Sequence, residues 1–363
     1  MSVPDAQTDR SWPRLFTDLL KGSDLSSEDT SWAMEQIMAG GASAAQVAGF
    51  LIALRAKGET VSEVRGLADT MREFAIAINV PGETLDIVGT GGDGAHTVNI
   101  STMSAIVAAG AGARVVKHGN RASSSSSGAA DVLEELGLAL DLPAQRVGAV
   151  AVDAGITFCF SQTFHPSMRH AAVPRRELGV PTAFNILGPL TNPARPKYSA
   201  VGCADSRVAD LIAGVFADRG SAAAVFRGDD GLDELTVATT STVRWVRNGQ
   251  ITLHRVDPGA LGIATASADA LRGGDAAHNA TVVHRVLAGA EGPIRDAVLL
   301  NTGIALSVVG NGGPGRYGGQ SSFEEALQIG VDRARTAIDD GSAARVLEQW
   351  IAITRDGVDS SRR

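Results

Sequence analysis

The feature that most constrains the fold is a change in hydrophobic pattern near residue 85. From Leu85 onward, short apolar runs alternate with longer stretches in which apolar residues recur at helical spacing. Such alternation is typical of a mostly parallel β-sheet whose strands are connected by helices. We therefore predict an α/β domain with strands at residues 85–88, 114–116, 156–160, 199–203 and 222–226.

The first eighty residues predict a small helical unit instead. Ser43 with Gln46 and Thr60 with Glu63 fit the capping box, in which two polar side chains close the start of a helix. Ser26 marks a further helix start, and Gly58 a helix end.

Later segments complete the expected elements. The Asn248-Gly249 pair lies between two apolar runs and predicts a tight β-hairpin. Residues 295–309 and 323–338 carry the clearest helical patterns of the C-terminal part. The proline-rich segment 187–196 has the composition of a linker, and we expect it to connect the helical and α/β parts.

Charge and composition exclude several functional classes. A net charge of −8 lacks the basic footprint of a nucleic-acid-binding protein. No apolar run approaches the roughly 18 residues of a membrane span. Cys159 and Cys203 have neither metal-site nor disulfide spacing, and the polar N-terminus lacks a signal-peptide pattern. We expect a cytoplasmic protein that binds neither nucleic acid nor membrane.

A glycine-rich run, Gly89-Thr90-Gly91-Gly92-Asp93-Gly94, directly follows the first predicted strand. It satisfies the dinucleotide-binding pattern GxGxxG, but no helix begins at once and no acidic residue follows about 20 positions later. A plain tight turn is the simplest alternative. We favour a loop whose backbone N–H groups bind phosphate, next to a helix beginning near Ser101.

A second polar motif, Lys117 to Ala122 followed by the serines 123–127, comes after the next predicted strand. Five serines alone are typical of a flexible linker. Here, however, they follow two cations at the carboxyl end of a strand, which is where open α/β sheets bind their ligands.

The segment 229–234 contains four acidic residues, of which Asp233 and Glu234 are the last. An acidic cluster is most often a solvated loop. Opposite a phosphate-binding loop it becomes a candidate magnesium site, since Mg²⁺ takes one or two carboxylates and completes its shell with water and phosphate oxygens.

A fourth motif holds His165, His170, Arg175 and Arg176. The histidines lack the HExxH spacing of zinc enzymes, so a zinc site is weakly supported. An arginine pair on a helix is normally surface charge, and it gains significance only if a substrate carboxylate must be bound.

Taken together, these motifs resemble the anthranilate phosphoribosyltransferases over nearly the whole chain. The resemblance rests on residues 89–93, 99–102, 117–121, 185–193 and 229–234. It implies a helical domain of residues 1–80, with helices from about 165–195 added, and an α/β domain of residues 81–164 and 196–363 that binds phosphoribosyl pyrophosphate. It also implies a homodimer assembled through the helical part.

The resemblance further implies the site residues. Magnesium would be held by Ser101, Asp233 and Glu234, and anthranilate would be contacted by Gly89, Asn120 and Arg175. Lys117, Asp233 and Glu234 would be the catalytic residues. Phosphoribosyl pyrophosphate would be contacted by Gly89, Gly92, Asp93, Thr97, Asn99, Ile100, Ser101, Thr102, Lys117, His118, Gly119, Asn120, Arg121, Ala122, Ser123, Ser124 and Ser125. The chain departs from the common family pattern at Ala129, Met168 and Pro174.

The implied reaction transfers the 5-phosphoribosyl group to the amine of anthranilate, a step of tryptophan biosynthesis, with Mg²⁺ as cofactor. Two alternatives are a pyrimidine nucleoside phosphorylase, which shares a lysine-plus-serine phosphate loop, and a non-enzymatic nucleic-acid-binding paralogue. The acidic pair and the 185–193 segment favour the transferase, and the net charge argues against the paralogue.

Overall fold

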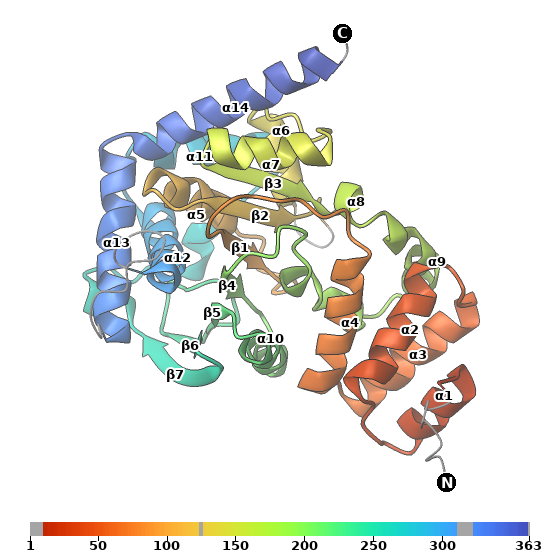
Figure 1. Cartoon of the computed structure of the whole chain (residues 1–363). Coiled ribbons are helices and arrows are strands. Elements are labelled where there is room, and N and C mark those ends of the chain that lie inside the picture. The colour runs from red at the N-terminus through yellow and green to blue at the C-terminus, as the bar shows by residue number, and fades with distance from the viewer. Residues whose placement is uncertain (1–9, 123–125, 311–321, 362–363) are drawn as a thin grey trace. The chain divides into compact units, whose positions relative to one another are not determined.

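A computed structural model describes residues 10–122, 126–310 and 322–361 (Figure 1). The chain forms two compact units. The first comprises residues 1–75 and 165–191, and the second comprises residues 76–164 and 192–363. None of the helices in the described ranges is long and apolar enough to cross a membrane.

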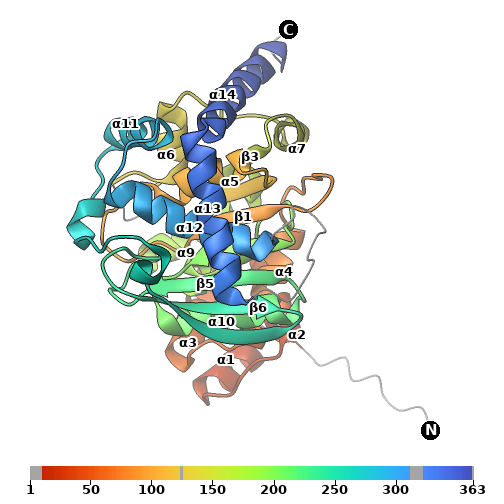
Figure 2. The ribbon, with the colours of Figure 1, turned by 90° about the vertical axis from the view of Figure 1, so that its left-hand side faces the viewer.

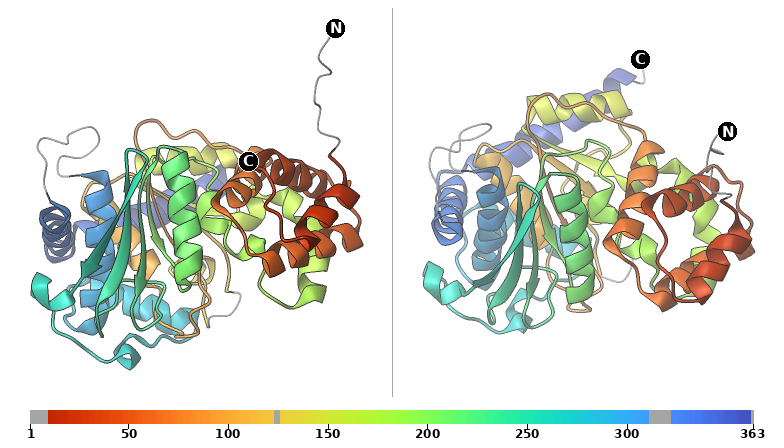
Figure 3. Two further views of the ribbon diagram at one scale, coloured as in Figure 1. Left: turned by 90° about the horizontal axis from the view of Figure 1, so that it is seen from below. Right: turned by 60° about the horizontal axis from the view of Figure 1, so that its bottom comes forward.

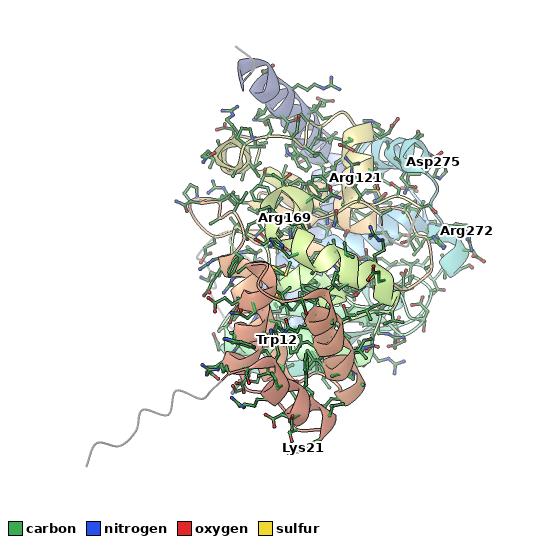
Figure 4. The ribbon with its side chains drawn as sticks, turned by 90° about the vertical axis from the view of Figure 1, so that its right-hand side faces the viewer. Trp12, Lys21, Arg121, Arg169, Arg272 and Asp275 are labelled. Carbon is green, nitrogen blue, oxygen red and sulfur yellow. The ribbon has the colours of Figure 1, made fainter. Side chains whose placement is uncertain are left out.

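The first unit is helical, as predicted. Its helices and short 3-10 turns are α1 (Trp12–Leu20), α2 (Ser27–Met38), α3 (Ala44–Lys57), α4 (Val61–Glu73), η1 (Pro166–Met168), α9 (Arg169–Leu178), η2 (Ala183–Asn185) and η3 (Gly188–Leu190). Trp12 and Lys21 mark the two ends of α1 in Figure 4. The three predicted helix starts are confirmed, because Ser26, Ser43 and Thr60 each accept a hydrogen bond from the third residue of the following helix. Gly58 ends α3 with a left-handed φ of 92°.

Close packing holds these helices together. Trp12 lies against Phe16, Trp32 and Phe50, with ring centroids 5.2 to 5.8 Å apart. Helices α2 and α4 touch at Gly66, where a Cβ atom would lie 2.2 Å from the Ser27 carbonyl oxygen. The absence of a side chain there lets the two backbones meet.

The second unit is built on a seven-stranded sheet of order β3-β2-β1-β4-β5-β6-β7. Strands β1 to β5 are parallel, and β6 and β7 add an antiparallel edge. All seven predicted strands are present: β1 (Leu85–Gly89), β2 (Val115–Gly119), β3 (Ile156–Phe160), β4 (Tyr198–Gly202), β5 (Ala222–Gly228), β6 (Ser241–Arg247) and β7 (Gln250–Val256). Asn248 and Gly249 join the last two with φ values of 51° and 73°, which confirms the tight hairpin.

Helices cover both faces of this sheet. Helix α10 packs on β5 and β6, while α12 packs on β4 and β5 from the opposite face (Figure 3). Helix α12 is buried on nearly every side, because α5 and α13 also pack against it (Figure 2). The helices and turns of this unit are α5 (Ile100–Gly110), α6 (Ala129–Glu135), α7 (Ala144–Asp153), α8 (Ser161–Phe164), α10 (Ser206–Asp218), η4 (Pro258–Leu261), η5 (Ala268–Leu271), α11 (Ala276–Leu287), α12 (Pro293–Val309), α13 (Phe323–Asp339) and α14 (Ser342–Ser361).

Two details of the sequence interpretation are corrected. The segment 187–196 contains the boundary between the units, at Thr191 and Asn192, yet it is not a loose linker. Most of its residues are buried, and the Asn192 side chain donates a hydrogen bond of 2.8 Å to the Val116 carbonyl. The helix expected near Ser101 begins one residue earlier, at Ile100.

Candidate active site

The candidate site lies where the strand order of the sheet reverses. From β1 the chain proceeds outward to β2, whereas from β4 it proceeds in the opposite direction to β5. The carboxyl ends of two strands that diverge in this way leave a crevice, which is the usual ligand site of open α/β sheets. Here the two strand ends are Gly89 and Gly202, paired side by side.

These two glycines make room for the acidic segment. A Cβ atom on Gly89 would lie 2.4 Å from the Asp233 carboxylate, and one on Gly202 would lie 1.6 Å from the Asp233 carbonyl oxygen. No side chain fits at either position. The tertiary structure therefore brings the acidic segment, about 140 residues away in sequence, directly onto the end of β1. Gly202 had no signal in the sequence, because nothing there indicated which strand adjoins β1.

Both carboxylates of the acidic segment are removed from water. Asp233 is 9% exposed and Glu234 is 8% exposed, and Asp233 accepts a 2.7 Å hydrogen bond from the Gly91 backbone N–H. Burial, together with the charge of Asp93, raises the pKa of Asp233 to about 7. Burial and the neighbouring Asp233 charge raise the pKa of Glu234 well above its usual range. A solvated loop would show neither property.

Crowded negative charge makes this corner a suitable place for a cation. One carboxylate oxygen of Asp93 is buried there without a hydrogen-bond partner in the described structure. No three His, Cys, Asp or Glu side chains of the described ranges form a ready-made metal cage. A donor set of two neighbouring carboxylates fits Mg²⁺, which completes its shell with water and phosphate oxygens.

Lys117 is the buried cation at the base of the site. It is 2% exposed, and its ammonium group donates to the Ile87 carbonyl at 2.6 Å and to the Ser101 hydroxyl at 3.2 Å. Burial lowers its pKa to about 8, against the opposing effect of Asp86, Glu234 and Asp233. Its positive charge is thus held within the negative cluster by strands β1 and β2.

Asp86, which the sequence analysis did not single out, fixes the end of β2. Its carboxylate accepts a 3.0 Å hydrogen bond from the His118 backbone N–H, and burial raises its pKa to about 6. The His118 ring in turn lies 3.1 Å from the Ser161 hydroxyl. Both contacts orient the polypeptide that leads into the second motif.

The glycine-rich loop after β1 is open. Gly91, Gly92 and Gly94 have left-handed φ values of 67°, 86° and 68°, and no atom lies within 4 Å of the position where a Cβ would be. Helix α5 follows without a side-chain cap from Asn99. An open glycine loop and the positive end of a helix dipole are features that bind phosphate.

The second motif is closed at its base by the first turn of α6. Asp131 accepts hydrogen bonds of 2.9 Å from the backbone N–H groups of both Ala122 and Gly128. Gly128 is required because a Cβ would lie 2.3 Å from the Ala122 nitrogen. Ser123, Ser124 and Ser125, predicted to contact phosphate, lie outside the described residues.

Arg121 does not point freely into the site. It forms ion pairs with Asp131 and Glu134 of α6 and lies over the Phe160 ring at 5.4 Å. Arg121 itself is labelled in Figure 4. The two hydrogen-bonded carboxylates raise its pKa. Its predicted contact with phosphate would compete with these partners, and it stays a prediction.

Arg175 belongs to the first unit. Its guanidinium lies 5.1 Å from the Phe184 ring centroid, and burial lowers its pKa. No carboxylate of the described ranges pairs with it, whereas the adjacent Arg176 is exposed. Pro174 is buried inside α9 and precedes Arg175 directly.

Comparisons with known proteins agree over almost the full length. Residues 81–344 match the α/β domain model of a glycosyl transferase family, and residues 13–75 match the helical bundle domain of that family. An anthranilate phosphoribosyltransferase from Nocardioides sp. JS614 is 62% identical over 94% of this chain and 98% of its own length. One from Arthrobacter sp. FB24 is 58% identical over 95% and 96%.

This chain belongs to the anthranilate phosphoribosyltransferase family.

Solved members of the anthranilate phosphoribosyltransferase family have the same fold. The enzyme from Thermus thermophilus superimposes with a TM-score of 0.84 at 38% identity, covering 94% of this chain and 99% of that one. The Saccharomyces cerevisiae enzyme, in complex with phosphoribosyl pyrophosphate and Mg, gives a TM-score of 0.84 at 28% identity over 96% and 99%. These findings support the transferase and neither of the two alternatives considered from the sequence.

The structure unites six of the predicted residues around the reversal point of the sheet. They are Gly89, Asp93, Ser101, Lys117, Asp233 and Glu234. Residues missed by the sequence analysis include Gly202, Asp86 and Asp131, because their importance depends on which segments become neighbours.

Proposed function

We propose that the chain transfers the 5-phosphoribosyl group of phosphoribosyl pyrophosphate to the amine of anthranilate and releases pyrophosphate, as in tryptophan biosynthesis. The observation that carries this proposal is the buried Asp233–Glu234 pair, packed onto the paired glycines Gly89 and Gly202 beside the phosphate-type loop. That arrangement supplies a cation site and backbone N–H groups at one crevice, as a pyrophosphate leaving group requires.

Asp233 and Glu234 would hold Mg²⁺ together with the Ser101 hydroxyl. Magnesium, when bound, neutralises charge that develops on a phosphate leaving group. The Ser101 hydroxyl is the acceptor of the Lys117 ammonium hydrogen bond, and the Glu234 carboxylate is bonded to the Ser101 backbone N–H. One turn of α5 therefore links the three proposed metal-binding residues to the buried lysine.

Phosphoribosyl pyrophosphate would lie along the two loops that follow β1 and β2. The groups we propose for it are Gly89, Gly92, Asp93, Thr97, Asn99, Ile100, Ser101, Thr102 and the segment from Lys117 to Ser125. When the anomeric C–O bond breaks, positive charge develops on the ribose and negative charge on pyrophosphate. Lys117 would stabilise the negative charge that develops on pyrophosphate. Its burial strengthens this interaction, because charges interact more strongly in a low-dielectric environment.

Anthranilate would be oriented by Arg175, with Gly89 and Asn120 as further contacts. A guanidinium can form two parallel hydrogen bonds to a carboxylate, and Arg175 has no such partner within the described ranges. The aryl amine is already a neutral nucleophile at pH 7, so positioning contributes more than deprotonation. We assign no general base.

We also propose a homodimer and a cytoplasmic location. Exposed apolar side chains in the first unit, Leu20 at 82% and Ile52 at 40%, support assembly through its helices. Two unpaired, buried cysteines suit a reducing compartment. Light scattering of the purified protein tests the first of these statements, since a monomer mass would contradict it.

The decisive experiment is a turnover assay with phosphoribosyl pyrophosphate, anthranilate and Mg²⁺. Loss of anthranilate fluorescence with equal release of pyrophosphate is expected, and chelation of Mg²⁺ should stop both. Thymidine with inorganic phosphate serves as the control for a phosphorylase. Turnover of thymidine and none of anthranilate would refute the proposal.

A further inference from the structure

Residues 271–273, which belong to no sequence motif, lie beside the glycine-rich loop that follows β1. Residues 271–273 form a short antiparallel ladder with residues 96–98, in which Val98 N–H donates to the Leu271 carbonyl at 2.9 Å and Gly273 N–H donates to the His96 carbonyl at 2.8 Å. Arg272 and Asp275, labelled in Figure 4, mark this segment and the start of α11. The loop that follows β1 is thus anchored by residues about 175 positions further along the chain.

Asn279, in the first turns of α11, extends this anchor through a chain of hydrogen bonds. Its side-chain oxygen Oδ1 accepts from the Gly274 N–H at 2.9 Å, and its side-chain nitrogen Nδ2 donates to the Asn99 Oδ1 at 2.8 Å. The Asn99 amide nitrogen then donates to the Ser127 backbone carbonyl at 3.0 Å. Asn279 is only 1% exposed, so water does not replace these bonds readily.

The direction of this chain of bonds is set by its two ends. Gly274 N–H can only donate and the Ser127 carbonyl can only accept. Each amide between them must therefore present its oxygen toward Gly274 and its nitrogen toward Ser127. Reversing either amide would place two donors or two acceptors face to face.

Close backbone approach makes the arrangement rigid. A Cβ on Gly273 would lie 2.8 Å from the Thr97 carbonyl oxygen and 2.9 Å from the Asn279 amide oxygen. The side chain of Asn99 is occupied on both sides, which explains why it does not cap α5. Asn279 therefore fixes the relative positions of three segments, which are the loop after β1, the start of α5 and the Ser127 end of the second motif.

We propose that Asn279 is a positioning residue for phosphoribosyl pyrophosphate: it touches no substrate itself but sets the relative position of the two loops that bind the diphosphate. The inference rests on the proposed function of those loops. It concerns one donor, the Asn279 side-chain amide nitrogen, whose loss leaves the half-buried Asn99 side-chain oxygen without that partner.

The test replaces Asn279 by Asp and, in a second variant, by Ala. Asn279→Asp keeps the shape and the bond from Gly274 but cannot donate to Asn99, while Asn279→Ala loses both bonds. Thr354→Val is the matched control, because Thr354 is also buried and bonds only to Ala139 and Ile351, which belong to none of these loops. The measurement is titration calorimetry with phosphoribosyl pyrophosphate and Mg²⁺, with the thermal unfolding midpoint recorded alongside.

We expect Kd for phosphoribosyl pyrophosphate to rise about tenfold or more in either Asn279 variant, because the hydrogen bond that fixes the two loops relative to each other is lost and such a bond is worth roughly that factor. In turnover assays KM for phosphoribosyl pyrophosphate should rise by a similar factor, with a change of about twofold or less in kcat. Thr354→Val should lower the unfolding midpoint without changing Kd.

Unchanged Kd in a folded Asn279 variant, or a rise in Kd that Thr354→Val reproduces, would overturn the inference. If Asn279→Asp does not fold, Asn279→Ala decides by the same criterion, since it introduces no charge. An error in the proposed function would instead be seen in the unsubstituted protein. That protein would then bind phosphoribosyl pyrophosphate without transferring its phosphoribosyl group to anthranilate, or would not bind phosphoribosyl pyrophosphate at all.

Discussion

The capped starts of helices α2, α3 and α4 in the first unit differ from the start of α5, which lies beside the candidate site in the second unit. In the first unit Ser26, Ser43 and Thr60 close the starts of α2, α3 and α4 with their own side chains. In the second unit α5 starts beside the candidate site without such a cap, because the Asn99 side chain is bonded to Ser127 and Asn279. A capping side chain stabilises a helix start, whereas the first N–H groups of α5 are bonded to the Val98 carbonyl and to the Glu234 carboxylate, which ties this start to the candidate site.

Helix starts in this chain can thus serve stability or function. Substitutions at the capped helix starts should change the free energy of unfolding. Substitutions at the candidate site beside the start of α5 should change turnover. The predictions below test this division, beginning with the largest expected effect.

The first prediction concerns the acidic pair, which we expect to serve function alone. Asp233→Asn with Glu234→Gln should lower turnover about a thousandfold or more, because the leaving group loses a stabilisation of several kcal/mol. The unfolding midpoint should not fall. Burial raises the pKa of both carboxyl groups, so the folded protein disfavours their charged forms and neutral amides remove that unfavourable term. Rates measured against Mg²⁺ concentration check this. If the double variant keeps wild-type activity and wild-type magnesium dependence, Asp233 and Glu234 do not bind the metal that turnover requires.

The second prediction concerns the pH dependence of stability in the first unit. Burial lowers the pKa of His165 to about 4 from its usual 6.5. Because the folded-state pKa of His165 is lowered, the stabilisation that its neutral ring contributes to the folded protein is complete above pH 6.5. This stabilisation is lost as the pH falls toward 4. The loss should reach about 3 kcal/mol at pH 4.

His165→Gln removes the titrating group, so its free energy of unfolding should vary less between pH 7 and pH 4 than that of the unsubstituted protein. Urea titrations at the two pH values measure this. Parallel pH profiles for both proteins would show that His165 is not the group responsible.

The third prediction tests whether the first unit serves stability alone. Arg175 belongs to that unit, yet we propose that it binds substrate. Arg175→Ala should lower kcat/KM for anthranilate about ten- to a hundredfold, the value of a hydrogen bond to a charged group. KM for phosphoribosyl pyrophosphate should change much less. Arg176→Ala is the control, because Arg176 is exposed on the same helix. Equal losses for both substrates, or a larger effect at Arg176, would show that the anthranilate site is elsewhere.

The smallest effect is expected at a capped start. Thr60→Ala removes the hydroxyl that accepts from the Glu63 N–H at 3.3 Å and should lower the free energy of unfolding by about 1 kcal/mol. Turnover per folded molecule should stay at the wild-type value. A loss of turnover without a loss of stability would mean that the first unit's helix starts are not purely structural.

The sequence by itself determined the local elements and the chemistry of single loops. Capping boxes, the Asn248-Gly249 hairpin and the apolar strands depend on residues a few positions apart, so their patterns are visible in the chain. The same holds for the glycine loop, the Lys117 motif and the acidic segment. Their joint meaning came from a family resemblance rather than from any single pattern.

Only the tertiary structure decided which of these parts meet. The pairing of Gly89 with Gly202 places Asp233 at the end of β1, and it depends on the strand order rather than on either segment alone. The bonds from Gly274 through Asn279 and Asn99 to Ser127 join residues separated by as many as 180 positions, and no local period signals such a contact. Local patterns arise because neighbouring residues share one helix or turn. Long-range contacts arise from packing of the whole sheet and its helices, which no short stretch of sequence records.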